Sequence, residues 1–479
     1  MLFNSLEFAI FFPLIVCIYF FLAQRWRTLW LLTTSCVFYM AFIPAYIIIL
    51  FVTILIDYCA GIYIEKTNPR GKFWLLSISI LATCLVLFVF KYFAFFTGTF
   101  VGFAEWFGWK ISLPTLNIIL PIGLSFHTFQ SLSYVIEVYR GHQKPERNFV
   151  TYATYVMFFP QLVAGPIERP QNLLPQFRER VGFDYERVSS GLKRIAWGLF
   201  KKVVVADRLA LYVSDVYGSP QKYNGLQLTL ATVFFAYQIY CDFSGYSDIA
   251  IGSARVLGFN LMENFKTPYY STSVSEFWKR WHISLSTWFR DYIYIPMGGS
   301  RLGETRLLLN VFITFLISGL WHGANWSFVA WGVLNGLYLI VGRITSEYRN
   351  KLFDRVGLGQ DTLTRQVIML VTTFTLTCGA WIVFRAQNLS DAWYIFTHLL
   401  SNWDIHEIKT PHFLLRHLPV ALAAIATLEV IQFCRQKRYP RFQWSSHPVY
   451  LRHAAYLAFV FTIILFGVFQ TSQFIYFQF

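Results

Sequence analysis

The sequence predicts an all-α polytopic membrane protein. Of its 479 residues, 56% are hydrophobic and only 14% are charged, whereas a soluble domain normally carries about 25% charged residues. Apolar stretches of about twenty residues, the length that crosses a bilayer as a helix, recur along the whole chain. Neither a soluble domain nor an internal repeat of the transporter type is visible in the sequence. We therefore expect one integral membrane domain over residues 1–479.

The formal net charge of +15 also has a membrane explanation. Lysines and arginines lie in short loops between the apolar segments, as positive-inside topology and contact with anionic lipid headgroups require. Membrane lipid is therefore the expected partner, and nucleic acid is not. The seven cysteines are far apart and lack CxxC or metal-ligand spacing, so we expect neither a metal site nor a disulfide framework.

The N-terminal segment, residues 1–27, is expected to remain as a first transmembrane helix. It lacks a basic n-region, carries Glu7 and ends at Arg25 and Arg27, whereas a signal peptide ends at a small-residue cleavage site. Basic residues after the helix, and none before it, place the N-terminus outside and this turn in the cytoplasm.

The other apolar segments bring the expected number of helical elements to about ten to twelve, several of which do not span the bilayer fully. The stretches 98–116 and 386–411 are expected outside, and the basic stretches 168–194, 259–306 and 343–366 in the cytoplasm. The predicted helical ranges are 29–44, 45–63, 74–97, 117–139, 224–244, 307–324, 325–342, 367–384, 412–433 and 452–470.

Segment 150–167 is expected to be broken or re-entrant. It is apolar but contains Pro160, Gly165 and Pro166, and the basic stretch 168–194 follows it, so both flanks look cytoplasmic. Non-helical backbone at membrane depth is tolerated only where it is buried in protein or lines a cavity. The segment therefore predicts a pocket open toward the cytoplasm.

Residues 274–290 predict one amphipathic helix at the cytoplasmic interface. Its polar face would carry Glu276, Lys279, Arg280 and Thr287, which an interfacial helix explains. That explanation does not account for a histidine among the tryptophans. The apolar face, at i, i+3, i+4 and i+7 spacing, would carry Trp278, Trp281, His282, Leu285, Trp288 and Phe289.

His322 is predicted to lie deep in the membrane. If Arg306 marks the cytoplasmic boundary, the fifteen residues of helix that follow place His322 about 22 Å into a core roughly 30 Å thick. Small or polar neighbours, among them Gly319, Gly323 and Asn325, would let a substrate approach the backbone. His322 could also serve only as a hydrogen-bonding residue between helices. Ionisable groups at this depth usually line a pathway or perform chemistry, and histidine accepts protons near neutral pH.

Other polar groups interrupt apolar segments. Asp242 and Asp248 could relay protons or orient a histidine, or they could pair with nearby arginines and hold helices together. His127, which follows Pro121 and Gly123, could line the same cavity, but a packing role is the simpler expectation. The HxxxxD, GxSxG, HExxH and P-loop templates are missing from the sequence.

Three segments closely resemble the membrane-bound O-acyltransferase (MBOAT) family: FFPQLVAGPIERP, the long block YCDFSGYSDIAIG to FRDYIYIPMGG, and FLISGLWHGANWSFVAWGVLNG. Within that family they resemble the bacterial branch that acetylates exported polysaccharides. The N-terminal FNSLEFAIFFPLIVCIYF is also similar, so the likeness covers nearly the whole chain.

The resemblance implies a ring of tilted and broken transmembrane helices around a central catalytic tunnel, with a core motif region at roughly 117–342. It implies that His322, in LWHG, is the catalytic histidine and that His282, in RWHIS, is the family's second histidine. It further implies a bacterial inner-membrane enzyme that has no permanently bound cofactor. Its donor would be a cytoplasmic acyl thioester such as acetyl-CoA, its acceptor a polysaccharide, and its partner a periplasmic acetyltransferase protein.

For acyl transfer, we expect His322 to act as the base and His282 to orient or polarise the donor. Trp321 and Asn325 are expected to support His322. Two alternatives remain at this point, namely D-alanyl transfer to a cell-wall polymer and transport without covalent chemistry. The basic residues Lys279, Arg280 and Arg290 could hold coenzyme A phosphates or could equally contact lipid headgroups.

Overall fold

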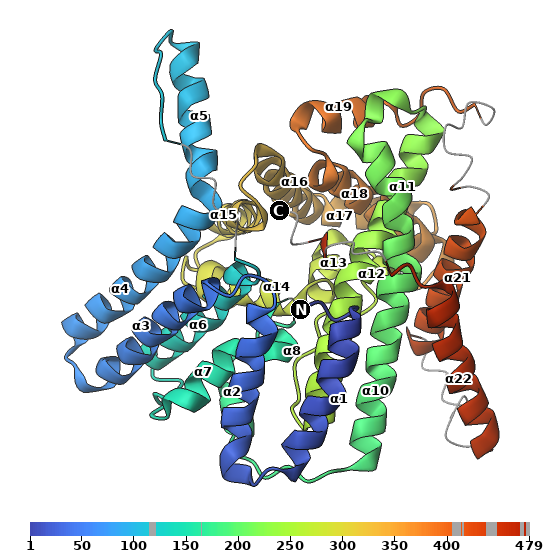
Figure 1. Ribbon diagram of the computed structural model, residues 1–479. Coiled ribbons are helices and arrows are strands. Elements are labelled where there is room, and N and C mark those ends of the chain that lie inside the picture. The colour runs from blue at the N-terminus through green and yellow to red at the C-terminus, as the bar shows by residue number, and fades with distance from the viewer. Residues whose placement is uncertain are drawn as a thin grey trace. The chain divides into compact units, whose positions relative to one another are not determined.

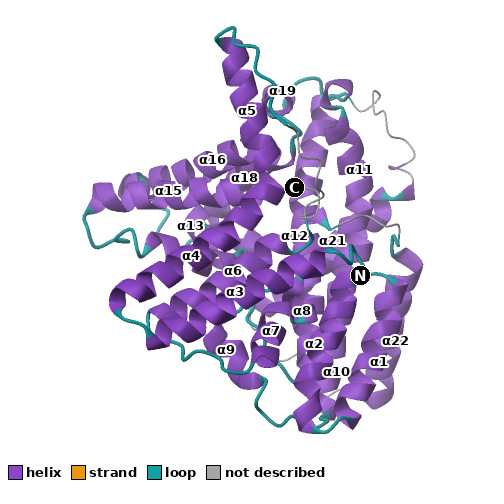
Figure 2. Cartoon of the chain, turned by 60° about the vertical axis from the view of Figure 1, so that its left-hand side comes forward, coloured by secondary structure: helices purple, strands orange, loops and turns teal. Residues whose placement is uncertain are grey.

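The computed structural model confirms the all-helical fold class. It describes residues 1–114, 121–163, 165–404, 413, 416–436, 448–469 and 474–475, and the regular structure throughout these residues is helical (Figure 2). Within them, six helical segments are long and apolar enough to cross a membrane. They are Tyr46–Lys66, Pro69–Trp106, Glu304–His322, Trp326–Ile344, Leu363–Arg385 and Val449–Phe466.

Some of the expected spans differ from these six. Leu6–Phe21, the predicted first transmembrane helix, and Leu418–Cys434 are apolar but shorter. The expected span 224–244 lies inside α12 (Gly225–Leu257), which is not among the six because polar residues such as Gln238 and Asp242 dilute its apolar character. The stretch 98–116, expected outside the membrane, is helical as far as Trp106, as part of α5 (Phe93–Trp106), even though Gly98 and Gly102 lie within it.

The chain divides into two compact units. The first contains Met1–Ile195 and Ser247–Met262, and the second contains Ala196–Tyr246 and Glu263–Phe479. Two helices, α10 (Tyr185–Leu199) and α12, contribute residues to both units.

The first unit begins with α1 and contains two short helices after the predicted break (Figure 1). Its helices are α1 (Leu6–Phe21), α2 (Gln24–Met40), α3 (Tyr46–Lys66), α4 (Pro69–Leu87), the π-helical segment Phe88–Tyr92, α5 (Phe93–Trp106), α6 (Leu124–Tyr139), α7 (Phe149–Met157), α8 (Phe159–Leu162) and α9 (Pro170–Gln176).

The broken element expected at 150–167 is confirmed. Helix α7 ends at Met157, Phe158 leaves the helical conformation with φ −50° and ψ 109°, and α8 restarts at Phe159. Pro160 stands in the first turn of α8, where a residue without an N–H costs no hydrogen bond.

Helices α3, α4 and α6 pack side by side (Figure 1). Asp57 of α3 is fully buried and accepts a hydrogen bond from Ser79 of α4 at 2.5 Å. His127 of α6 is buried as well, with Nε2 3.5 Å from Thr53 Oγ1. Its surroundings agree with the packing role that we expected for this histidine.

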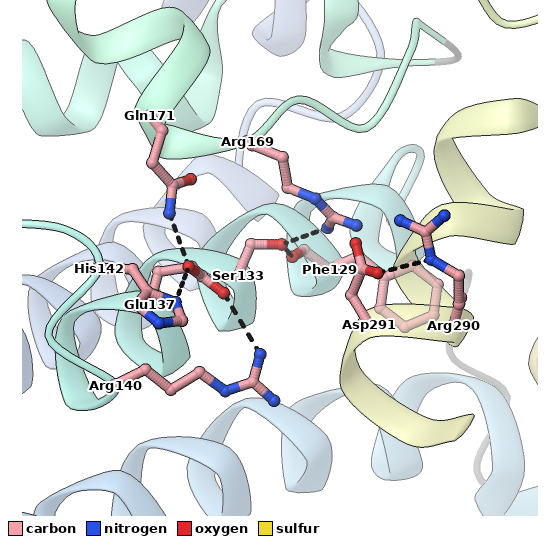
Figure 3. Close-up of polar contacts among 9 residues, drawn as sticks. All are labelled: Phe129, Ser133, Glu137, Arg140, His142, Arg169, Gln171, Arg290 and Asp291. Atoms are coloured by element: carbon pink, nitrogen blue, oxygen red, sulfur yellow. Dashed lines mark hydrogen bonds and ion pairs between the residues drawn. The ribbon is translucent and has the colours of Figure 1, made fainter. Parts of the chain in front are cut away.

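The basic loop after α6 is bound to the carboxylate of Glu137. Glu137 Oε2 accepts a hydrogen bond from the Gln171 side chain at 2.6 Å and lies 3.1 Å from His142 Nδ1 (Figure 3). The other carboxylate oxygen, Oε1, lies 3.4 Å from Arg140. This single carboxylate therefore fixes the end of α6 to the start of α9.

The second unit contains most of the long apolar helices. Its elements are the π-helical segment Phe200–Ala206, α11 (Asp207–Gly218), the 3-10 turns Pro220–Lys222 and Pro268–Tyr270, α13 (Val274–Arg280), α14 (Ile283–Phe289), the π-helical segment Arg290–Tyr294, α15 (Glu304–His322), α16 (Trp326–Ile344), α17 (Ser346–Arg355), α18 (Leu363–Arg385), α19 (Leu389–His398), α21 (Leu418–Gln436) and α22 (Val449–Phe466).

Helices α15 and α16 cross at two glycines. A Cβ on Gly319 would stand 2.4 Å from the carbonyl oxygen of Phe328, and one on Gly332 would stand 2.5 Å from that of Phe315. Both distances are too short for a side chain, so glycine lets the two backbones touch. Small residues serve this purpose widely in membrane helix pairs.

The single helix predicted over 274–290 is wrong. Helix α13 ends at Arg280, His282 adopts the left-handed conformation with φ 43° and ψ 56°, and α14 begins at Ile283. The main chain instead pairs with a distant loop, because Ile283 N–H donates to the carbonyl of Asn264 at 3.0 Å. The predicted apolar face is nevertheless largely buried, including Trp281, His282, Leu285, Trp288 and Phe289.

Candidate active site

His322 is the last residue of α15 and is buried, with 5% of its surface exposed. Aromatic rings surround its imidazole. The ring centroids of Trp321 and Trp331 lie 4.9 Å away, and that of Phe384 lies 5.4 Å away. An imidazole at the end of a membrane-spanning helix is thus enclosed on several sides by apolar surface, which excludes water from that part of its surroundings.

The loop after His322 is shaped by a glycine and an asparagine. Gly323 is extended, and a Cβ there would stand 2.1 Å from the ring of Phe328. Asn325 is exposed and caps α16, since its side chain accepts a hydrogen bond from Ser327 N–H at 2.9 Å. Of the two residues expected to support His322, Trp321 contacts the His322 ring. The described hydrogen bonds of the Asn325 side chain are instead to Ser327 N–H and to the carbonyl oxygen of Gln387.

His282 lies between α13 and α14 and is 1% exposed. Its Nδ1 is 3.1 Å from the side-chain oxygen of Asn264, and Ser284 donates to the same oxygen. The ring of Phe243 stands edge-on to the imidazole at a centroid distance of 4.5 Å. Burial lowers the pKa of His282 to about 3, so the ring is uncharged at neutral pH.

One aromatic cluster within the second unit reaches both histidines. It starts at His282 and continues through Phe243, Phe265 and Trp281, with successive centroid distances of 4.5, 5.0 and 5.1 Å. From Trp281 it passes to Trp381 at 5.0 Å, then to Phe384 at 5.5 Å and to His322 at 5.4 Å. The two histidines predicted from the sequence thus belong to one packed assembly.

Most members of this cluster were not predicted. Trp331, Trp381 and Phe384 stand in α16 and α18, in apolar stretches where an aromatic residue is expected for packing alone. Asn264, which lies outside the cluster, stands in a loop within the long block that resembles the MBOAT family, and Trp331 stands in the FLISGLWHGANWSFVAWGVLNG segment. No local pattern singled out any of the four as a site residue.

Asp242 takes part in a buried ion cluster in the second unit. Lys202, which is 1% exposed, places its Nζ 2.8 Å from Asp242 and 2.7 Å from Asp207. Burial opposes the lysine charge, but the two carboxylates outweigh it and raise the pKa of Lys202. Asp242 also accepts a hydrogen bond from the backbone N–H of Ile475 at 2.8 Å. Its observed partner is a lysine, whereas an arginine or a histidine was expected.

The three basic residues expected near a donor lie at the surface or close to it. Lys279 is exposed. Arg280 is paired with Glu276 at 2.6 Å. The exposed Arg290 is paired with Asp291 at 2.8 Å (Figure 3). Across the described residues, no group of three or more His, Cys, Asp or Glu side chains is placed to hold a metal ion.

Comparison with known proteins identifies the family. Residues 142–381, about half of the chain, match the model of the MBOAT, membrane-bound O-acyltransferase, family. A probable alginate O-acetylase, AlgI, from Pseudomonas putida is 36% identical over 442 residues, which cover 90% of this chain and 87% of that protein.

Two further relatives carry different names. A peptidoglycan O-acetyltransferase of Helicobacter pylori is 33% identical over 76% of this chain and 72% of its own length. A teichoic acid D-alanyltransferase of Bacillus subtilis is 24% identical over 57% of this chain and 71% of its own length. The prediction of an O-acyltransferase is therefore confirmed, and the alternative of transport without chemistry is not carried further. This multi-pass, all-helical chain belongs to the membrane-bound O-acyltransferase family.

Proposed function

We propose that the protein moves an acetyl group from a cytoplasmic thioester donor, acetyl-CoA, toward an exported cell-surface polysaccharide. The transfer would be direct or pass through a periplasmic partner protein. The relatives with the higher identities carry the names of polysaccharide O-acetylating enzymes, which supports acetyl as the acyl group. D-alanyl transfer is the second candidate, supported by a relative of lower identity.

The observation that carries the proposal is the environment of His322. Acyl transfer from a thioester to a hydroxyl needs a base for the hydroxyl proton and groups that stabilise the oxyanion. An imidazole enclosed by Trp321, Trp331 and Phe384 can take that proton where little water competes as the acceptor. We assign the role of base to His322.

His282 is proposed to orient or polarise the donor. Its uncharged ring, hydrogen-bonded through Nδ1, can orient the donor by accepting a hydrogen bond at Nε2, and it carries no positive charge that would neutralise a phosphate. The phosphates of coenzyme A would be bound by Lys279, Arg280 and Arg290. Lipid headgroups are the competing ligands, and the carboxylates already paired with Arg280 and Arg290 favour a modest role for these two.

We further propose that residues 1–479 act as one domain in a bacterial inner membrane, with the N-terminus outside and the donor entering from the cytoplasm. The MBOAT ring of tilted helices around a catalytic tunnel is part of this proposal. The basic connecting segments support that orientation.

The test is acetyl transfer by the purified protein in detergent, with radiolabelled acetyl-CoA and a panel of surface glycans. His322→Gln should lower turnover by about 10²- to 10⁴-fold, the usual contribution of a general base. His127→Gln, a matched change at an equally buried histidine of the first unit, should retain most of the activity. Wild-type turnover in His322→Gln would contradict the assignment. Transfer from a D-alanyl carrier without acetyl transfer would favour the second candidate.

A further inference from the structure

We propose that Asn264 is a positioning residue that holds His282 in the tautomer with its proton on Nδ1, so that Nε2 presents the lone pair. The inference rests on the proposed function, in which His282 acts on the acyl donor. Asn264 lies in the loop after α12 and is itself 1% exposed.

Three donors converge on the side-chain oxygen of Asn264. The backbone N–H of Ser284 reaches it at 3.2 Å, the Ser284 hydroxyl at 3.0 Å, and His282 Nδ1 lies 3.1 Å away. A backbone N–H can only donate, so the amide must turn its oxygen, and not its NH2 group, toward this point. An oxygen that only accepts requires the hydrogen on Nδ1. In the neutral ring, Nε2 is then the acceptor.

The backbone keeps this arrangement in place. The carbonyl of Asn264 accepts the N–H of Ile283 at 3.0 Å, and Lys266 N–H donates to the carbonyl of Arg280 at 2.9 Å. The loop is therefore bound on both sides of His282, which has the left-handed φ of 43° that non-glycine residues adopt rarely. Such a conformation persists where the surroundings determine it and is common at functional sites.

The position of the ring is limited on another side by Phe243, which stands at 90° to it. Asn264, Ser284 and Phe243 are all uncharged, and burial keeps the pKa of His282 low. A neutral imidazole of known tautomer, held by an amide and not by a carboxylate, can accept a hydrogen bond or a proton at Nε2 without carrying a permanent charge.

The experiment compares four variants of the full-length protein in detergent. His282→Gln tests whether the histidine matters at all. Asn264→Leu removes the acceptor, and Asn264→Asp keeps an acceptor oxygen while adding a negative charge. Ser284→Ala is the matched control, since it removes one donor to the same oxygen and leaves the bond to His282. Melting temperature and size-exclusion profile report on folding.

We expect Asn264→Leu to lower kcat by about 10- to 100-fold, as loss of a residue that orients a functional histidine does elsewhere. Asn264→Asp should keep the tautomer but raise the pKa of His282, because a carboxylate favours the imidazolium. The acid limb of the pH dependence of kcat/KM should then move upward by about one to three units. A residue with only a structural role would not move this limb. Ser284→Ala should leave the limb where it is.

The two ways of failing are distinguishable. Full activity in His282→Gln would refute the proposed role of His282, and with it any role for Asn264 in positioning that ring. An inactive His282→Gln together with wild-type kcat in Asn264→Leu, or with an unmoved acid limb in Asn264→Asp, would overturn only the inference about Asn264. If Asn264→Leu does not fold, the pH profile of Asn264→Asp decides.

Discussion

The ring of His282 is perpendicular to that of Phe243, with centroids 4.5 Å apart and an interplanar angle of 90°. The Phe243 ring on one side of the imidazole and the Asn264 amide at Nδ1 leave the histidine buried, neutral and oriented. The contact joins a residue between two short helices to the long helix α12, and it anchors one end of the aromatic cluster that leads to His322.

Burial of this ring should make the protein sensitive to acid. The pKa of His282 is about 3 in the folded protein and about 6.5 in an unfolded chain. Below pH ~6.5 the unfolded state therefore binds a proton that the folded state excludes, and the stability due to the neutral ring is lost as the pH falls toward 3. The expected loss is about 1.4 kcal/mol per pH unit in that window.

Thermal melting between pH 7.5 and 4.5 measures this effect. The wild-type protein should lose stability more steeply than His282→Gln, in which the titrating group is missing. Parallel curves for the two proteins would show that the histidine does not control the acid response.

The contact between α15 and α16 should tolerate no side chain at Gly332. A Cβ there would stand 2.5 Å from the Phe315 carbonyl oxygen, so Gly332→Ala must push the helices apart at a cost of about 1–3 kcal/mol. Gly342 lies in the same helix with open space around it, and Gly342→Ala should be neutral or slightly stabilising. Equal melting temperatures for both variants would contradict the close approach.

The buried lysine should be needed for folding. Lys202→Met leaves the Asp207 and Asp242 carboxylates without their cation, and breaking a buried ion pair costs about 3–5 kcal/mol. Lys279→Met, at an exposed position, should change stability by less than about 0.5 kcal/mol. Urea unfolding followed by far-UV circular dichroism compares the two.

The same cluster bears on whether Asp242 relays protons or fixes the packing. Asp242→Asn can still accept the N–H of Ile475, so we expect lower stability but a kcat within a few-fold of wild type for the folded enzyme. A loss of about 10²-fold in kcat with normal folding would favour the proton relay.

The segment near the C-terminus should contribute to stability through Phe474. Its ring is fully buried, 4.5 Å from Tyr246 and 5.7 Å from Phe243. Phe474→Ala should cost about 3–5 kcal/mol, the range for a buried phenylalanine. Phe469→Ala provides the control, because that ring is 55% exposed. Similar losses in the two variants would mean that the burial of Phe474 is not what stabilises this segment.

Local patterns predicted part of the fold correctly. Composition alone indicated a helical membrane protein, and Pro160 with its neighbours indicated the break after α7. The sequence placed His282 among tryptophans on the apolar face of the predicted helix, and the structure shows that His282 is buried in the protein. The same periodicity suggested a continuous helix, which was wrong, since periodicity cannot register a partner such as Asn264, 18 residues away.

The sequence by itself thus determined that this is an all-helical membrane O-acyltransferase. It also indicated His282 and His322 as the principal candidates for catalytic residues. Hydropathy, helix breakers and motifs are properties of continuous stretches of the chain, so they can be recognised from the sequence alone. Only the tertiary structure decided that Asn264 meets His282, that Lys202 meets Asp242, and that Trp331 and Phe384 enclose His322. All of these contacts join different helices or loops, and except for Trp331 with His322 the partners are 18 or more residues apart in the chain. They form only when the chain folds and packs these segments against one another.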